Sequence, residues 1–402
     1  MSVMHAVLSN RQQPEYGVAT IPFPIPTEEY DHVLEILTPL GIGDALQRDC
    51  QVDEIYGEYP VLRCLEGQSI NLDELDFLAK RLDSFSNTEK AQFQGMAEKG
   101  RYTDLTDLIN LTYSCQQATV ITDFSDLETI GRQHYMNVNG GGARVEELEN
   151  LDGVETALLL ISDNRGTVTP YGVVYDNGME LEQLYDGQTF PDYRHQNCEM
   201  EIGIQSASAP DTSAEMAWLY LPAANGQIEH AIKRIGGSAY HGIHIFPTDT
   251  ALPKPVMEAM DIRCESLEDL NEVCKLTRTM SVEEKTKLGA VVLMAEPEYA
   301  YQIKHLAQNL EQFEFIPGAK TPEDYGRYMI QRSGRFEFDD NLDAYYDYAR
   351  YAEDRMRHES GQFNELGYIS YHGTMSLEEL MMEDPAGQYQ KEQTFQMGGM
   401  SL

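Results

Sequence analysis

The sequence predicts an α+β protein, built as a tandem duplication of one elongated, acidic, multi-subdomain unit with small sheets and capped helices. Three observations support this prediction: apolar residues at helical spacing behind N-cap residues, short segments of alternating polarity, and an acidic phrase that occurs twice. Residues 71–90 read NLDELDFLAKRLDSFSNTEK, and residues 266–285 read SLEDLNEVCKLTRTMSVEEK, 195 positions later. Solenoid repeats are only about 20–50 residues long, so this spacing indicates a duplicated domain.

The repeated phrase predicts two helices in each copy. Apolar residues recur at helical spacing from Leu72 in the first copy and from Leu267 in the second. The residues just before them, Asn71 and Ser266, are typical N-caps. A Ser-x-x-Glu capping box at positions 86–89, and again at 281–284, predicts the start of another helix.

Further matches extend the duplication along the chain. DLETIGRQ (126–133) corresponds to TPEDYGRY (321–328), and YDHVLEIL (30–37) corresponds to IEHAIKRI (228–235). VYDNGMELEQL (174–184) corresponds to SYHGTMSLEEL (370–380), which pairs Tyr175 with Tyr371. In each copy an alternating segment such as VATIPFPI or AWLYLPA predicts an opening strand, and YGVVYD or YISYHG predicts a closing one.

These matches set the expected domain boundaries. The first unit spans residues 15–195 and the second spans residues 215–385. Residues 1–14 form an N-terminal arm, and the small polar residues within 196–214 suggest a linker. Residues 386–402 have no apolar periodicity and are expected to form a mobile tail.

The charge balance excludes several functions. The chain has 67 Asp and Glu against 29 Lys and Arg, a net charge of −38 that both halves share. Direct binding to nucleic acid or to an anionic membrane is disfavoured, because its main electrostatic contribution has the wrong sign. The six cysteines form no C-x-x-C pair, and no export signal or long apolar run is present. We therefore expect a cytoplasmic protein with reduced thiols.

No motif in the sequence predicts a catalytic or metal site. His241 and His244 lack the further ligands that zinc requires, and the glycines of NVNGGGAR (137–144) lack the Gly-Lys-Ser/Thr of a phosphate loop. His32 and His230 occupy equivalent helical positions and are expected to be structural. The tyrosines of 343–354 lie among carboxylates, which favours packing or a protein contact over base stacking. We expect no cofactor, no metal and no enzymatic activity.

The acids themselves are the remaining candidates. Duplex DNA carries one phosphate per about 1.7 Å of axis, so 38 charges equal those on roughly 65 Å of duplex. Helical neighbours three or four residues apart stand about 5–6 Å apart, close to the spacing of phosphates along one strand. Salt adaptation would explain the same charge. The candidate phosphate mimics are acids on helix faces that we expect to be exposed: Asp73, Asp76, Asp83, Asp104, Asp107, Glu146, Glu147, Glu149, Glu268, Asp269, Glu283, Glu284, Glu323, Asp324, Asp339, Asp340, Asp343 and Asp347.

Several segments resemble the ArdA antirestriction proteins of mobile genetic elements. They are TPEDYGRYMI (321–330), FDDNLDAYYDYARYAEDRM (338–356), ELGYISYHGTMSLEEL (365–380) and INLDELDFLAKRLDSF (70–85). The resemblance implies an elongated acidic protein that imitates bent B-DNA and occupies the DNA-binding groove of type I restriction–modification enzymes. It supplies no catalytic residues. Family members are often dimeric, and the fusion of two units leaves open a homodimer or an intramolecular pseudo-dimer.

We therefore expect a DNA-mimic inhibitor of a type I restriction–modification enzyme or of another DNA-binding complex. Two alternatives belong to other functional classes: a hydrolase whose carboxylates or metal site assemble only in the fold, and an acidic scaffold or chaperone for basic proteins. An enzyme would gather a few acids in a concave pocket, whereas mimicry requires many exposed acids.

Overall fold

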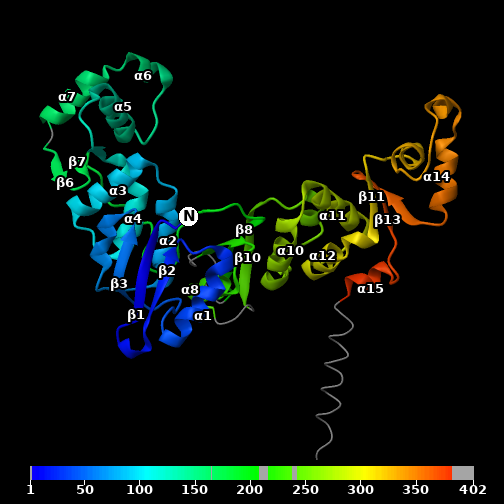
Figure 1. Ribbon diagram of the computed structural model, residues 1–402, viewed down its shortest axis with the longest axis horizontal. Coiled ribbons are helices and arrows are strands. Elements are labelled where there is room, and N and C mark those ends of the chain that lie inside the picture. Colours follow the sequence, from blue (N-terminus) through cyan, green and yellow to red (C-terminus); the bar gives the residue numbers. More distant parts are fainter. Residues whose placement is uncertain (1, 164, 208–215, 238–241, 383–402) are drawn as a thin grey trace, which may run out of the picture. The chain divides into compact units, whose positions relative to one another are not determined.

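Small sheets and capped helices alternate in the computed structural model, which describes residues 2–163, 165–207, 216–237 and 242–382 (Figure 1). This arrangement confirms the predicted α+β class. The chain packs into two units. Unit 1 holds the described residues up to Asn197, with Ile204–Trp218 and Ala223–Ile243. Unit 2 holds Cys198–Gly203, Leu219–Pro222 and the described residues from His244 onward.

Unit 1 begins with a sheet in the order β2-β1-β3-β4. Its strands are β1 (Met4–Asn10), β2 (Val18–Phe23), β3 (Cys50–Gly57) and β4 (Ser69–Ile70), and α1 (Tyr30–Leu37) lies between β2 and β3 in the chain. β1 is antiparallel to both of its neighbours and buries Met4, Ala6 and Leu8. It therefore belongs to the core, which differs from the N-terminal arm expected for residues 1–14.

Three helices follow in unit 1: α2 (Leu72–Asp83), α3 (Asn87–Gly100) and α4 (Leu105–Ser114). A second sheet has the order β5-β7-β6, formed by β5 (Thr119–Ile121), β6 (Thr167–Thr169) and β7 (Gly172–Tyr175). Between β5 and β6 lie α5 (Leu127–Val138), α6 (Val145–Asn150) and α7 (Gly153–Asp163). Unit 1 also contains α8 (Asn225–Arg234), which packs against α1.

The later part of the chain has elements in a similar order. A sheet in the order β10-β8-β9 is formed by β8 (Met200–Ser206), β9 (Ala217–Leu221) and β10 (Ile243–Thr250). After α9 (Lys254–Glu258) come α10 (Leu267–Thr279), α11 (Val282–Ala295) and α12 (Ala300–Gln308). The next sheet, β11-β13-β12, consists of β11 (Phe313–Pro317), β12 (Ser360–Phe363) and β13 (Gly367–Tyr371), with α13 (Pro322–Arg327) and α14 (Tyr348–Met356) between β11 and β12. α15 (Leu377–Met381) follows. β8 falls inside the segment 196–214 suggested as a linker, and the expected tail 386–402 lies outside the described residues.

The predicted helix caps are confirmed in both halves. Asn71 accepts hydrogen bonds from backbone N–H groups of the first turn of α2, and Ser266 accepts one at the start of α10. Complete capping boxes open α3 at Ser86 and α11 at Ser281. The starts of α2 and α10 lie 195 residues apart, as do those of α3 and α11. Equivalent side chains cap the helices at both places.

Glycines allow a close helix crossing in each half. A Cβ on Gly131 of α5 would lie 1.9 Å from the carbonyl oxygen of Gly153, at the start of α7. A Cβ on Gly326 of α13 would lie 2.1 Å from the carbonyl oxygen of Tyr348, at the start of α14. Both pairs of positions are 195 residues apart, so α7 and α14 hold equivalent places beside their partner helices.

The sheet register corrects one sequence match. Ile121 lies opposite Val173, and Ile316 lies opposite Tyr368, so the two sheets correspond at a spacing of 195 residues. This register pairs Tyr175 with Ser370 and not with Tyr371. The pairing of two tyrosines shifted the alignment by one residue, because identical aromatic residues outweighed the alternation of the strand.

Candidate acidic interface

The eighteen candidate acids differ in exposure. Twelve are exposed: Asp83, Glu146, Glu147, Glu149, Glu268, Glu283, Glu284, Glu323, Asp324, Asp339, Asp340 and Asp347. Four are half-buried: Asp104, Asp107, Asp269 and Asp343. Asp73 and Asp76 are buried, so the expected exposure is wrong for these two residues.

Some exposed acids also cap helices. Glu284 and Asp324 complete capping boxes, and Asp339 and Asp347 accept backbone hydrogen bonds at the start of a short 3₁₀ helix and of α14. Hydrogen bonds from Ser281 lower the pKa of Glu284, and those from Thr321 lower the pKa of Asp324. Negative charge is stabilised at a helix N-terminus, so these carboxylates stay ionised where solvent reaches them.

Other candidate acids have basic partners. Asp104 lies 2.9 Å from Arg48, and Asp269 lies 2.7 Å from Lys304. Arg327 contacts both Glu323, at 3.3 Å, and Asp343, at 2.6 Å, while Asp83 lies 2.9 Å from a ring nitrogen of His195. These pairs reduce the local field without removing the large excess of acid.

Five exposed candidates have no side-chain hydrogen bond or ion pair among the residues that the structure describes. They are Glu146, Glu149, Glu268, Glu283 and Asp340. Each lies within the first six residues of a helix. Their carboxylates are therefore available to a cationic partner.

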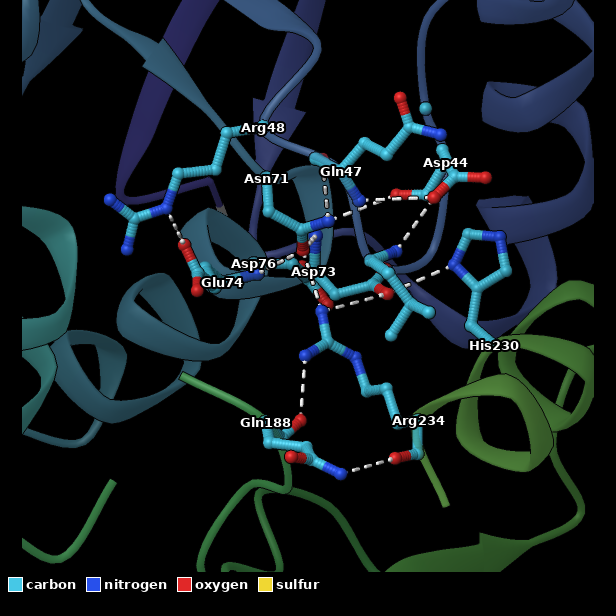
Figure 2. A network of polar contacts seen from close by, with 12 residues as sticks. Asp44, Gln47, Arg48, Asn71, Asp73, Glu74, Asp76, Gln188, His230 and Arg234 are labelled. Atoms are coloured by element: carbon cyan, nitrogen blue, oxygen red, sulfur yellow. Dashed lines mark hydrogen bonds and ion pairs between the residues drawn. The ribbon is translucent and has the colours of Figure 1, made fainter. Parts of the chain in front are cut away.

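Asp73 and Asp76 lie in a buried network around α2 (Figure 2). Asp76 accepts a hydrogen bond from the backbone N–H of Ile25 at 2.6 Å and lies 2.7 Å from the ammonium group of Lys80. Every residue from Asn71 to Ala79 is buried, so α2 packs against protein on all sides along this stretch. Helical periodicity correctly placed the leucines inside but could not show that the acidic face is covered as well.

Asp73 is held by residues from two other helices. Nδ1 of His230 lies 2.9 Å from Oδ2 of Asp73, and the guanidinium of Arg234 lies 3.4 Å from the same oxygen. Both side chains come from α8, as Figure 2 shows. The hydroxyl of Tyr30, on α1, donates to Oδ1 of Asp73.

Arg234 also joins α8 to other parts of unit 1. It donates to Oδ1 of Asn71 at 2.6 Å and to the carbonyl oxygen of Gln188 at 2.9 Å, and its guanidinium stacks 4.4 Å from the ring centre of Phe190. The N-terminus of α8 is held by Asp31 of α1, whose carboxylate accepts a 2.7 Å hydrogen bond from the Gly226 N–H. The network therefore fixes α8 on α1 and α2, and His230 has the structural role expected for it.

The network shifts the ionisation of its members. Burial alone would raise the pKa of Asp73, but the hydrogen bond and charge interaction with His230, together with Arg234 and Tyr30, hold that pKa below its usual value. Burial raises the pKa of Glu74, despite the opposing effect of Arg48. Burial and the neighbouring Asp73 raise the pKa of Tyr30 well above its ordinary value. Asp73 is thus a buried anion with hydrogen-bond partners and the charge of Arg234 beside it, the usual condition for burying a charge.

Sequence reasoning singled out His230 but missed Arg234. The signal was present, because residues four apart on a helix share one face, and His230 and Arg234 lie four apart in IEHAIKRI. Its partner Asp73 lies 157 residues earlier, and no local pattern connects them.

The other sequence motifs lie largely in the described part of the chain. No group of three or more His, Cys, Asp or Glu side chains is arranged to hold a metal ion there. His244 is an exposed residue of β10, and His241 lies outside the described residues. Gly140 and Gly141 adopt left-handed conformations in an exposed turn, and Tyr348 of the tyrosine run packs on Arg327.

Comparison with known proteins identifies one family. Residues 214–370 match the family model of the antirestriction protein (ArdA). No curated protein matches the chain significantly. Among the helices of the described residues, none combines the length and apolar character that a membrane crossing requires.

Proposed function

Because residues 214–370 match the family model of the antirestriction protein (ArdA), we propose that the chain belongs to this family and inhibits a restriction–modification enzyme by imitating DNA. The proposed target is a type I enzyme, and the proposed working groups are the exposed carboxylates. One observation carries the proposal: sixteen of the eighteen candidate acids are exposed or half-buried, in a chain with a net charge of −38.

The spacing of these acids supports electrostatic mimicry. Glu146 and Glu149 stand three residues apart on α6, and Glu283 and Glu284 lie in the first turn of α11. Neighbours three or four apart on a helix are about 5–6 Å apart, so a basic groove can contact several at once. Affinity that comes from many such contacts falls steeply with salt, as it does for DNA itself.

We further propose that the family unit occurs twice. The matched residues lie in the later half, and the first half has a similar order of strands and helices. The three-stranded sheets β5-β7-β6 and β11-β13-β12 have the same strand order, and β10-β8-β9 matches three of the four strands of β2-β1-β3-β4. In this proposal one family unit begins at β1 and the other at β8, earlier than the starts at residues 15 and 215 expected from the sequence. The chain then either dimerises or acts as a pseudo-dimer.

A binding competition tests the proposal. A fluorescent duplex is bound to a purified type I methyltransferase, and the protein is titrated in at several salt concentrations. We expect displacement of the duplex that weakens as salt rises, because each engaged carboxylate replaces a phosphate contact. A triple variant, Glu146→Gln with Glu147→Gln and Glu149→Gln, should displace less duplex and show a shallower salt dependence.

A matched control tests whether position matters. Glu28, Glu29 and Glu35 are exposed acids around α1 outside the candidate set. Their triple glutamine variant removes the same charge and should compete nearly as well as the wild type. Failure of the wild-type protein to displace DNA would refute the proposal, and equal losses in the two variants would indicate a nonspecific effect of net charge.

A further inference from the structure

Helix α7 carries an exposed aliphatic face. Val154, Leu158 and Leu159 are 41%, 51% and 54% exposed, although the helix buries Ala157 and Leu160 completely or almost so. Val154 and Leu158, four residues apart, are neighbours on the helix surface. Leu159 lies about 100° farther around the helix, so the three side chains share one half of its circumference. The apolar side chains on the opposite side already complete the packing of α7.

The equivalent helix of the later half has no such face. The glycine crossings make α7 and α14 correspond at a spacing of 195 residues, so the positions of Val154, Leu158 and Leu159 are held in α14 by Ala349, Glu353 and Asp354. Glu353 and Asp354 are exposed. The fold therefore accepts carboxylates at these places, and packing within the helix pair does not require leucine there.

The segment of chain that leads into α7 is acidic, and the carboxylate of Glu128 accepts a hydrogen bond from the Val154 N–H at 3.2 Å. Residues 123–155 contain eight Asp and Glu and only two arginines, and one of these, Arg132, lies 2.6 Å from Glu128. Glu155 is exposed and falls between Leu158 and Leu159 around the helix. Two copies of this face would bring like charges together, whereas a surface rimmed by Lys and Arg would complement it.

We propose that the α7 face docks on an apolar patch beside the basic DNA-binding groove of the restriction enzyme; this inference rests on the proposed function. A duplex offers phosphates but no aliphatic ridge, so Val154, Leu158 and Leu159 supply a contact that DNA cannot make. Apolar burial persists at salt concentrations that screen exposed charges. The face therefore gives the inhibitor a salt-resistant share of its affinity and an advantage over DNA.

The test uses the full chain in the same methyltransferase competition, from low to high salt. The double variant Leu158→Glu with Leu159→Asp copies the residues found in α14. A purely electrostatic contact predicts equal or tighter binding, because the variant adds carboxylates. We expect binding about 10- to 100-fold weaker, since two partly exposed leucines lose their apolar contact.

A second variant separates apolar loss from added charge. Leu158→Ala with Leu159→Ala should weaken binding about tenfold at every salt concentration, because no charge is removed and the salt dependence stays unchanged. Val282→Thr, a matched change at an 83% exposed valine of α11, should leave binding unchanged. Circular dichroism melting of each variant confirms that it folds.

Three outcomes would overturn the inference. If the wild type competes and both leucine variants compete equally well, the α7 face does not contribute to binding, although the proposed function holds. If sedimentation shows a larger assembly that either leucine variant dissociates, the face binds a second copy instead. If the wild type does not compete at all, the proposed function and this inference fail together.

Discussion

At the residue scale, the main feature is the carboxylate of Asp73, which is buried beside His230 and Arg234. Asp73 depends on His230 and Arg234, and removing one partner of a buried ion pair leaves the other charge uncompensated. We expect Arg234→Ala to lower the free energy of unfolding by about 3–5 kcal/mol in urea denaturation. The control is Arg357→Ala, because Arg357 makes a solvent-exposed pair with Asp354 and should contribute about 1 kcal/mol or less. Equal effects of the two changes would argue against a structural role for the network.

The same network predicts opposite pH effects for two neighbouring acids. The pKa of Asp73 is lowered by folding, so its contribution to stability is present above the unfolded value, about 3.9, and is lost as the pH falls through the folded pKa. The pKa of Glu74 is raised, so ionising Glu74 costs stability as the pH rises above about 4.3. We expect the urea midpoint of Asp73→Asn to fall less than that of the wild type as the pH is lowered. We expect the urea midpoint of Glu74→Gln to rise relative to that of the wild type between pH 4 and pH 7. Parallel pH curves for the three proteins would contradict this assignment.

At the element scale, the close crossing of α5 and α7 depends on a glycine. Gly131→Ala would place a methyl group 1.9 Å from a backbone carbonyl, so the helices must separate. We expect a loss of about 1–3 kcal/mol and faster amide exchange in α5 and α7. Gly142→Ala is the control, because no atom lies within 4 Å of its added Cβ. Unchanged exchange in Gly131→Ala would mean that the crossing is not tight.

Local features of the helices could be predicted from the sequence, whereas contacts between distant elements could not. The caps at Asn71, Ser86, Ser266 and Ser281 were predictable, because each needs only residues two or three positions away. The burial of Asp73 was not, because α8 covers it from 157 residues away. The expected N-terminal arm, residues 1–14, followed from where the matched repeat begins. Only the pairing of β1 with both β2 and the more distant β3 makes it a central strand.

At the scale of the whole molecule, the acids repel one another. A net charge of −38 stresses the folded state, and salt screens such repulsion beyond about 10 Å at 0.1 M. We expect the melting temperature to rise between 20 and 300 mM NaCl. A flat or falling curve would mean that local ion pairs balance the acids. Single exposed acids should matter little: Glu283→Gln should change inhibition only slightly, whereas an enzyme would lose its activity with one essential carboxylate.

The attachment of α8 to α2 also affects where the gene could be truncated without destabilising the first unit. A gene truncated after residue 197 would still encode Asp73 but would lose its partners His230 and Arg234, whereas one truncated after residue 243 would keep them. We expect the shorter product to be the less stable of the two, because its Asp73 carboxylate would have to be buried without these partners. A shortened gene that retains a stable first unit would therefore end after α8 and not before it.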